Sequence, residues 1–223
     1  MPYPKGVRNK QGQSQTLLID GLVLARVFRQ FAALLAQNEQ LLNDVNVFPV
    51  PDSDTGTNSL LTIQAGLAHI DKGKKDAAAV ANLVATDAGA SARGNSGVIL
   101  AEFLRGIAQS ETAELDSQGL QAALTTAAEL AQQSVAVPRE GTMLTVAQAA
   151  SAVNPSDELT AYAAELARTA RETVIDSTSL LDELRAAGVV DAGAMVLSFF
   201  FDALHEVVSG TKLPAITLAQ TSC

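Results

Sequence analysis

The stretch NVFPVPDSDTGTNSLL, from Asn46 to Leu61, separates two apolar segments of helical spacing and so marks a boundary between two helices. Pro49 and Pro51 end the first segment, because proline lacks the backbone N–H that a helix interior needs. Asp52 and Asp54 follow, directly before the next apolar run. Two carboxylates about 4 Å apart repel each other by about 4 kcal/mol at an effective dielectric constant of about 20. We therefore expect a positive charge beside this pair.

The composition predicts an all-α protein. Of the 223 residues, 48% are hydrophobic and only 4% are aromatic, so alanine, leucine and valine must supply most of the core. Alanine and leucine are the strongest helix formers. Because short links join most of the expected helices, we expect an antiparallel up-and-down bundle or barrel of about eight helices.

Helical periodicity, broken by glycine, proline and polar clusters, divides the chain into segments. Asn95 or Ser96 is expected to cap the fourth helix, and Ser156 or Asp157 the seventh. Residues 1–16 are expected to form a flexible arm, residues 17–210 one domain and residues 211–223 a tail. The expected helices cover about residues 20–42, 57–70, 76–90, 95–107, 120–135, 143–153, 159–174, 179–187 and 195–209.

Charge and cysteine content exclude several classes of protein. The formal net charge is −9 and the pI is about 4.6, which argues against a nucleic-acid surface. The single cysteine is the last residue, which excludes an internal disulfide framework and favours a reducing compartment. No uninterrupted apolar run reaches the roughly 18 residues of a membrane helix. The polar start lacks the apolar core of a secretory signal, so we expect a cytoplasmic protein without an integral membrane segment.

Four glycine-containing breaks carry the polar residues suited to chemistry: VPDSDTGTN, SARGNSGV, PREGTML and GVVDAGA. Each leads into an expected helix, and a helix N-terminus presents free N–H groups that suit phosphate. The turns Gly56–Asn58 and Gly94–Gly97, the second of which includes Asn95, would hold phosphates, and Arg93 is placed to reach one. Asp52 and Asp54 would then bind Mg²⁺, which shares its ligands with substrate phosphates. Together these features indicate a nucleotide site, most simply for ATP.

A simpler interpretation exists for each of these residues. Asp52 and Asp54 could form only a capping cluster, because an Asp-x-Asp pattern is short and frequent. The Gly-Asn-Ser-Gly segment could be an ordinary turn, and Arg93 a surface residue paired with an acidic neighbour. The chain contains neither a P-loop nor a Gly-x-Gly-x-x-Gly fingerprint. From the residues alone, both interpretations stay open.

The segments NVFPVPDSDTGTN, ARGNSGVIL, EGTMLTV and AGVVDAGA occur in this order within residues 17–210. They resemble the ATP-binding N-terminal domain of bacterial fatty-acid kinase, in the family of the nucleotide-binding (DAK2, DhaL-like) subunit of dihydroxyacetone kinase. The resemblance implies a barrel of antiparallel helices with ATP or ADP and two Mg²⁺ ions at one end. It matches Asp52 and Asp54 to magnesium ligands and places Asn46 near a further metal ligand. Residues matched to the nucleotide are Thr57, Asn58, Ser96, Gly97, Thr142 and Asp191.

The resemblance also implies an activity. It is transfer of the ATP γ-phosphate to a substrate presented by a partner, here a fatty-acid carboxylate on a DegV-like protein, giving an acyl phosphate. A carboxylate is ionised at pH 7 and needs no general base. His69 and His205 lie in expected helices away from the glycine-rich breaks, where packing or exposure explains them.

Two alternative functions stay open: a dihydroxyacetone kinase-type subunit with a hydroxyl substrate, and a non-catalytic nucleotide-binding module. A homodimer stays open as the oligomeric state. The chain departs from the family pattern at Ser53, where the fatty-acid kinases usually have glycine. If that position needs a positive φ, serine is strained there. The later domains of the fatty-acid kinases are absent from this chain, so we expect an excised domain or a separate subunit.

Overall fold

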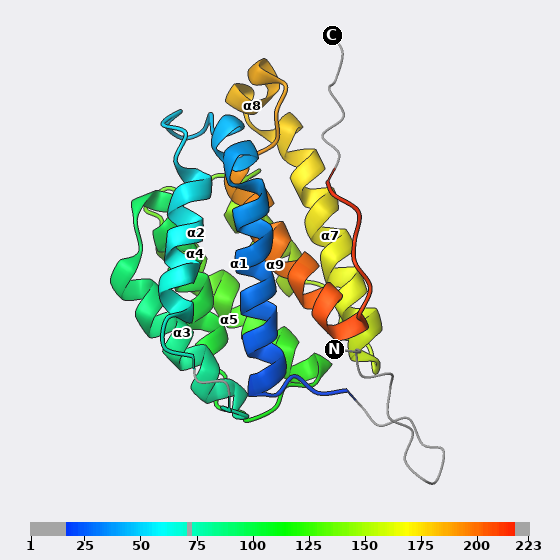
Figure 1. Cartoon of the computed structure of the whole chain (residues 1–223). Helices are drawn as coiled ribbons and strands as arrows, with labels where there is room; N and C mark the ends of the chain where they lie inside the picture. The colour runs from blue at the N-terminus through cyan, green and yellow to red at the C-terminus, as the bar shows by residue number, and fades with distance from the viewer. Residues whose placement is uncertain (1–16, 71–72, 217–223) are drawn as a thin grey trace.

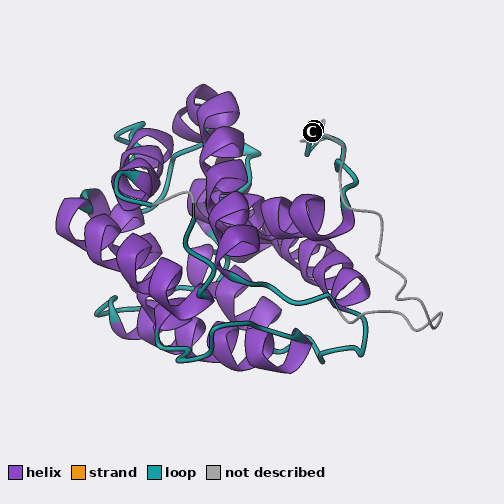
Figure 2. Cartoon of the chain, turned by 60° about the horizontal axis from the view of Figure 1, so that its bottom comes forward, coloured by secondary structure: helices purple, strands orange, loops and turns teal. Residues whose placement is uncertain are grey.

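The computed structural model describes residues 17–70 and 73–216, and within these ranges it consists of helices and connecting loops (Figure 2). One isolated antiparallel bridge pairs Ile19 with Leu115. The expected arm at residues 1–16 and the end of the expected tail at residues 217–223 lie outside the described residues. The helices are α1 (Gly21–Asp44), α2 (Thr55–Leu67), α3 (Ala77–Ser91), α4 (Gly94–Ala108), α5 (Ser117–Gln133), α6 (Met143–Ser151), α7 (Leu159–Leu180), α8 (Asp182–Ala187) and α9 (Ala192–Ser209).

Each helix from α1 to α7 packs against the next one along the chain. The last helix, α9, packs against α1, α2, α6 and α7, and Figure 1 shows it beside α1 and α7. The first residues of α2, α4, α6 and α9 lie at the same end of the bundle, because they line one cavity. The all-α prediction is confirmed, and the described residues form nine helices, which agrees with the nine expected segments. Closure into a barrel stays a prediction.

Five of the seven phenylalanines form one cluster in the core, although the aromatic content is low. The Phe200 ring of α9 lies with its centroid 5.3–6.3 Å from those of Phe28, Phe31, Phe103 and Phe201. These side chains come from α1, α4 and α9, and such pairs stabilise by about 0.5–1.5 kcal/mol beyond their burial. The cluster therefore fixes α9 against the first and fourth helices.

Helix α9 is long and apolar enough to cross a membrane by length and composition alone, with a mean hydropathy of 1.3. Its sequence includes the acidic residues Asp202 and Glu206, and 72% of the helix is buried inside the protein. The core of the bundle explains its apolar character, because it contacts four other helices.

Two expected capping residues and one expected helix end are wrong. Arg93 occupies the N-cap position of α4 and Glu158 that of α7, and neither side chain makes a cap hydrogen bond. The prediction chose Asn95 or Ser96 because these residue types are good caps. In the structure the helix begins one residue earlier, at Gly94. Helix α7 continues to Leu180 rather than stopping at Val174, because no glycine or proline interrupts residues 175–180.

A matched pair of glycines tests the packing. A Cβ atom on Gly106 of α4 would lie only 2.2 Å from the Ala127 Cα atom and 2.5 Å from its backbone nitrogen. We expect Gly106→Ala to lower the free energy of unfolding by about 1–3 kcal/mol or more, because α4 and α5 must move apart. Nothing lies within 4 Å of a Cβ on Gly89 in α3, so Gly89→Ala should instead stabilise the protein by about 0.5–1 kcal/mol. Urea unfolding of both variants measures the difference, and equal effects would contradict this packing of α4 on α5.

Candidate functional site

A cavity of about 450 Å³ opens at the end of the bundle where α2, α4, α6 and α9 begin. In Figure 1 this end is uppermost and carries the α1–α2 loop. The cavity is lined by residues from all four glycine-containing breaks of the sequence. Its polar lining residues are Asn46, Asp52, Asp54, Thr55, Asn95, Ser96, Ser134, Arg139, Thr142 and Asp191.

Asp52 and Asp54 lie on the cavity wall formed by the α1–α2 loop. Asp52 is exposed and Asp54 is half-buried. The buried Asn46 donates a hydrogen bond from Nδ2 to Asp52 Oδ1 at 2.8 Å. This bond orients the Asp52 carboxylate and leaves the Asn46 amide oxygen as the atom that could accept a further contact.

The capping interpretation does not hold for Asp54. Although Asp54 occupies the N-cap position of α2, its side chain makes no cap hydrogen bond. The first-turn donors are instead taken by Asn43 of α1, whose Oδ1 accepts from Gly56 N at 2.8 Å and from Thr57 N at 3.2 Å. A Cβ on Gly56 would lie 2.5 Å from the Glu39 carbonyl oxygen, so glycine permits this close approach. The Asp54 carboxylate is therefore available to a ligand.

The first turn of α4 also faces the cavity without a side-chain cap. Gly94 begins the helix with a φ of +62°, and a Cβ there would lie 2.5 Å from Asn58 Nδ2. Asn95 and Ser96 follow and line the cavity. Uncapped N–H groups at a helix start attract anions, because they carry a partial positive charge. This turn suits a phosphate group.

Thr142 and Asp191 are the N-caps of α6 and α9, and both line the cavity. Thr142 forms a capping box with Thr145. Asp191 is only 4% exposed, and its Oδ2 accepts a hydrogen bond from Ala194 N at 2.7 Å. Burial raises the pKa of the Asp191 carboxyl to about 7, although backbone hydrogen bonds from Ala194 and Gly193 act to lower it. A substantial share of this carboxyl is therefore protonated at neutral pH.

Four residues expected at the nucleotide do not line the cavity. Thr57 faces α1, where its Oγ1 donates to Glu39 Oε1 at 2.7 Å. Asn58 is buried beside Gly94, and a Cβ on Gly97 would meet Thr62 Oγ1 at 2.7 Å. Arg93 is exposed and makes no ion pair with the described residues. The structure thus gives Thr57, Asn58 and Gly97 packing contacts around the site.

The cavity also contains residues that the sequence analysis did not single out. Arg139 lines it, with its guanidinium carbon 5.7 Å from the centroid of the Phe48 ring. The break PREGTML contained this signal, since it places an arginine beside a glycine turn. Val50, Val98 and Val137 form exposed apolar parts of the wall, with 56%, 42% and 73% of their surface accessible. No periodic pattern marked these valines, because they lie at loops and helix starts.

The metal ligands that this chain offers are few. Within the residues that the structure describes, no group of three or more His, Cys, Asp or Glu side chains could hold a metal ion. Asp52 and Asp54 are two carboxylates at one wall of the cavity. Mg²⁺ fits such a set, because it prefers oxygen ligands and usually keeps waters and substrate phosphates in its other positions.

The position before Asp54 has the backbone conformation that favours glycine. Ser53 has a φ of +55°. In the described part of the chain, no other residue except glycine has a positive φ. The position does need a positive φ, so serine is strained there, as expected for that case.

Comparison with known proteins identifies the family. A family model described as the DAK2 domain matches residues 49–206. This chain belongs to the DAK2 domain family. Its relatives include an uncharacterized protein of Staphylococcus epidermidis (strain ATCC 12228 / FDA PCI 1200), 32% identical over 205 residues, which cover 88% of this chain and 37% of the relative. An uncharacterized protein of Staphylococcus aureus (strain USA300) is 33% identical over 208 residues, with the same coverage of 88% and 37%. This DAK2 domain thus spans little more than a third of the length of these relatives.

Solved structures share the fold of this DAK2 domain. The dihydroxyacetone kinase of C. freundii in its native form has a TM-score of 0.60 at 20% identity, covering 92% of this chain and 38% of that chain. The same kinase in complex with AMP-PNP and Mg²⁺ has a TM-score of 0.65 at 18% identity. The predicted DAK2 family is confirmed by the family model, and the dihydroxyacetone kinase shares the fold. The assignment to the fatty-acid branch stays a prediction.

Relief of the strain at Ser53 is measurable. A left-handed conformation costs a non-glycine residue about 1–2 kcal/mol, whereas glycine adds about 0.4–1 kcal/mol of unfolded-state entropy. We expect Ser53→Gly to raise the free energy of unfolding of the DAK2 domain by up to about 1.6 kcal/mol, by the difference of these terms. Ser53→Ala keeps the strain and serves as the control. A Ser53→Gly variant less stable than Ser53→Ala would contradict the left-handed geometry.

Asp191 predicts a pH-dependent stability of the nucleotide-free DAK2 domain. Its pKa is about 7 in the folded state and near the ordinary 3.8 when unfolded. Between these values the folded state retains a proton that the unfolded chain has lost. Stability therefore falls as pH rises from about 4 to about 7, by up to about 1.4 kcal/mol per pH unit. Asparagine cannot ionise, so we expect Asp191→Asn to gain stability relative to the parent as the pH rises from about 4 to about 7.

Urea unfolding at a series of pH values measures this gain. Asp116→Asn removes an exposed N-cap carboxylate from α5 and controls for the loss of a charged cap. A parallel trend in both variants would trace the effect to capping rather than to burial, and a flat difference for Asp191→Asn would contradict the raised pKa.

Proposed function

We propose that this DAK2 domain binds ATP with Mg²⁺ and transfers the γ-phosphate to an acceptor that another protein presents. One observation carries the proposal: a single cavity brings Asp52 and Asp54, whose carboxylate makes no cap hydrogen bond, together with the uncapped first turn of α4. Carboxylates suit a divalent cation, and a free helix start suits phosphate. The fold is shared with a dihydroxyacetone kinase whose structure was solved with AMP-PNP and Mg²⁺, which supports ATP as the nucleotide.

Asp52 and Asp54 would hold the metal, and Asn46 would fix the orientation of Asp52 through its hydrogen bond. When bound, Mg²⁺ supplies charge that offsets the phosphate oxygens during transfer. The resemblance implies two ions, with Asn46 near a further ligand position. Two carboxylates leave most coordination positions of either ion to phosphate and water.

The residues of α4 and the α5–α6 connection would hold the phosphates. The backbone N–H groups at Asn95 and Ser96 lack a side-chain cap, so they can donate to phosphate oxygens. Arg139 replaces Arg93 in this proposal as the cation of the cavity, because Arg139 lines it and Arg93 does not. Thr142 and Asp191 border the same space from α6 and α9. Positioning and electrostatics can supply most of the catalysis in phosphoryl transfer.

A fatty-acid carboxylate is the acceptor that this cavity fits best. Its titratable lining residues are Asp52, Asp54, Arg139 and Asp191, and no His, Lys or Cys is among the lining residues within the described ranges. A carboxylate oxygen is already ionised at neutral pH and attacks without a base. It forms a bond to the γ-phosphorus while the bond from that phosphorus to the β–γ bridging oxygen breaks, which leaves ADP and an acyl phosphate. The exposed valines of the wall suit an apolar acceptor or the surface of its carrier, for which a DegV-like protein is the proposed partner.

Asp191 favours the second candidate, a hydroxyl acceptor of the dihydroxyacetone type. A hydroxyl must lose its proton on transfer, and a carboxyl whose burial raises its pKa to about 7 is suited to take it. The third candidate is a nucleotide-binding module without activity of its own, which the strained Ser53 favours. A cytoplasmic location is consistent with each candidate and stays a prediction, as does a homodimer.

Calorimetric titration of ADP tests the metal-bridged site. We expect ADP to bind the parent in Mg²⁺ and to bind at least about tenfold more weakly in EDTA, because the carboxylates would otherwise repel the phosphates. Asp54→Asn should lose the Mg²⁺ dependence while its melting temperature without nucleotide stays unchanged, since Asp54 makes no cap bond. Asp157→Asn removes an exposed carboxylate elsewhere and should bind as the parent does. Equal ADP affinity in Mg²⁺ and EDTA would contradict the proposed site.

ATP consumption then separates the three candidates. Turnover that requires a fatty-acid-loaded DegV-like protein supports the proposal, and turnover that requires a dihydroxyacetone-presenting subunit supports the second candidate. Mg²⁺-dependent ADP binding with no turnover on either partner identifies a module without activity.

A further inference from the structure

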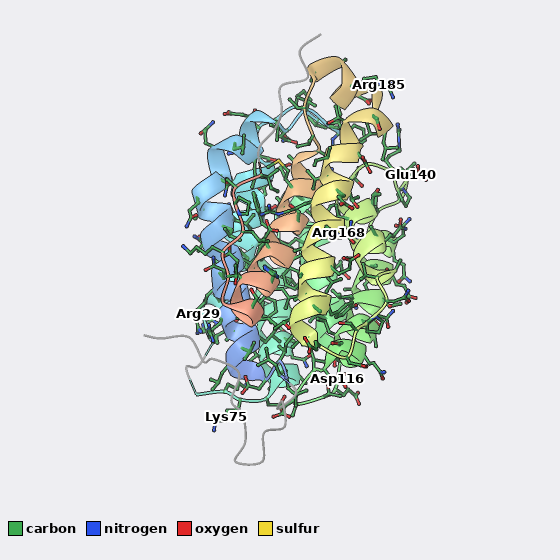
Figure 3. All side chains as sticks on the ribbon, turned by 90° about the vertical axis from the view of Figure 1, so that its right-hand side faces the viewer. Arg29, Lys75, Asp116, Glu140, Arg168 and Arg185 are labelled. Carbon is green, nitrogen blue, oxygen red and sulfur yellow. The ribbon has the colours of Figure 1, made fainter. Side chains whose placement is uncertain are left out.

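A second cavity, of about 270 Å³, lies between the first half of α1 and the end of α9. Its lining residues are Arg26, Arg29, Gln30, Glu206, Val207, Gly210 and Lys212. Figure 3 shows Arg29 beside one end of α9. Arg185, which belongs to α8, lies at the opposite end of the molecule. Since α1 rises about 1.5 Å per residue, Arg29 lies about 20 Å along the helix from the loop that carries Asp52. This basic cavity is therefore separate from the candidate nucleotide site.

The basic cavity concentrates positive charge on a chain whose formal net charge is −9. It contains three cations, Arg26, Arg29 and Lys212, against one carboxylate. None of the three forms an ion pair with the residues that the structure describes. By contrast, Arg105, Arg168, Arg171 and Arg185 each pair with a carboxylate.

The Glu206 carboxylate accepts hydrogen bonds from α1 and from the segment that follows α9. Its Oε2 accepts a hydrogen bond from Gln30 Nε2 at 2.7 Å, and its Oε1 accepts one from Leu213 N at 3.1 Å. Both oxygens are thus oriented by groups other than the arginines. The carboxylate shapes the cavity without pairing with Arg26 or Arg29.

Arg26, Arg29 and Lys212 are exposed side chains that gather at one cavity. Arg26 and Arg29 are one helical turn apart on α1, so their charges lie on the same face and repel. A cation near the end of α9 offsets the partial negative charge of that terminus, and Lys212, two residues beyond the C-cap Gly210, is placed to do so. Arg26 and Arg29 are not needed to offset the charge of the α9 terminus, because Lys212 can do so. A bound anion would offset the repulsion between the two arginines.

We propose that the basic cavity binds an oxyanion, a phosphate or carboxylate group, through Arg26, Arg29 and Lys212. Guanidinium groups bind such groups through two parallel hydrogen bonds, and lysine adds a point charge. A soluble phosphate-bearing ligand and the head group of an anionic lipid present the same chemistry. The proposal is independent of the function assigned to the first cavity, because the two share no lining residue.

Titration of inorganic phosphate into ¹⁵N-labelled protein tests this site. EDTA is present throughout, and sodium chloride at matched ionic strength is the reference. We expect saturable shifts of the Nε–H signals of Arg26 and Arg29 and of the amide signals of Gly210 and Lys212. The double variant Arg26→Gln/Arg29→Gln should bind phosphate at this site at least about tenfold more weakly, because it loses two charge-assisted contacts. Arg105→Gln, which removes an exposed arginine of α4, should bind as the parent does.

A second arm uses sedimentation with vesicles of phosphatidylcholine alone or with phosphatidylserine added. Binding only to the anionic vesicles, lost in the double variant, supports the site and identifies a lipid head group as its source. Phosphate binding without vesicle binding supports it and identifies a soluble ligand. Shifts confined to residues 93–98 and 191–194, or phosphate and vesicle binding unchanged in a folded double variant, would overturn the proposal.

Discussion

The side-chain oxygen of Asn43 accepts hydrogen bonds from the backbone N–H groups of Gly56 and Thr57, and the candidate site depends on this contact. A helix start must find acceptors for its first N–H groups, and the usual acceptor is the side chain at the N-cap. Because Asn43 reaches across from α1, the N-cap residue Asp54 is released from that task. Glycine at position 56 makes the reach possible, since any larger residue would meet the α1 backbone.

The first cavity contains both negative and positive groups around the Asp54 carboxylate. Asp52 and Asp54 bring negative charge to one wall, while Arg139 and the uncapped start of α4 bring positive charge and free donors. Asp191 contributes less negative charge than its residue type indicates, because burial raises its pKa to about 7. An anionic ligand bridged by a divalent cation complements both halves.

The core determines whether these groups meet. The phenylalanine cluster fixes α9 against α1 and α4, and so places the α9 N-cap beside the α4 start and the α1–α2 loop. The far end of the same pair of helices, α1 and α9, forms the basic cavity. Both cavities are consequences of one antiparallel helix pairing. The start of α9 lines the first cavity with the α1–α2 loop, and the end of α9 lines the second with the first half of α1.

The amino-acid sequence determined the helices and the chemistry of their connections. Spacing of apolar residues located the buried faces, as at Leu24, Phe28, Phe31 and Leu35, which are all buried, because periodicity is a local property of the chain. The four polar breaks identified the lining of the first cavity, and the family resemblance on those segments agrees with the matched DAK2 domain.

Only the tertiary structure decided which residues in those breaks face the cavity. Thr57, Asn58 and Gly97 stand inside recognisable motifs, yet their contacts are to Glu39, Gly94 and Thr62, which no local pattern relates to them. The N-caps of α4 and α7 were misassigned for the same reason, since Arg93 and Glu158 hold these positions although neither side chain makes a cap hydrogen bond. Arg26, Arg29 and Lys212 meet only because α1 and the end of α9 are neighbours in space, and contacts between residues so far apart along the chain leave no local signal in the sequence.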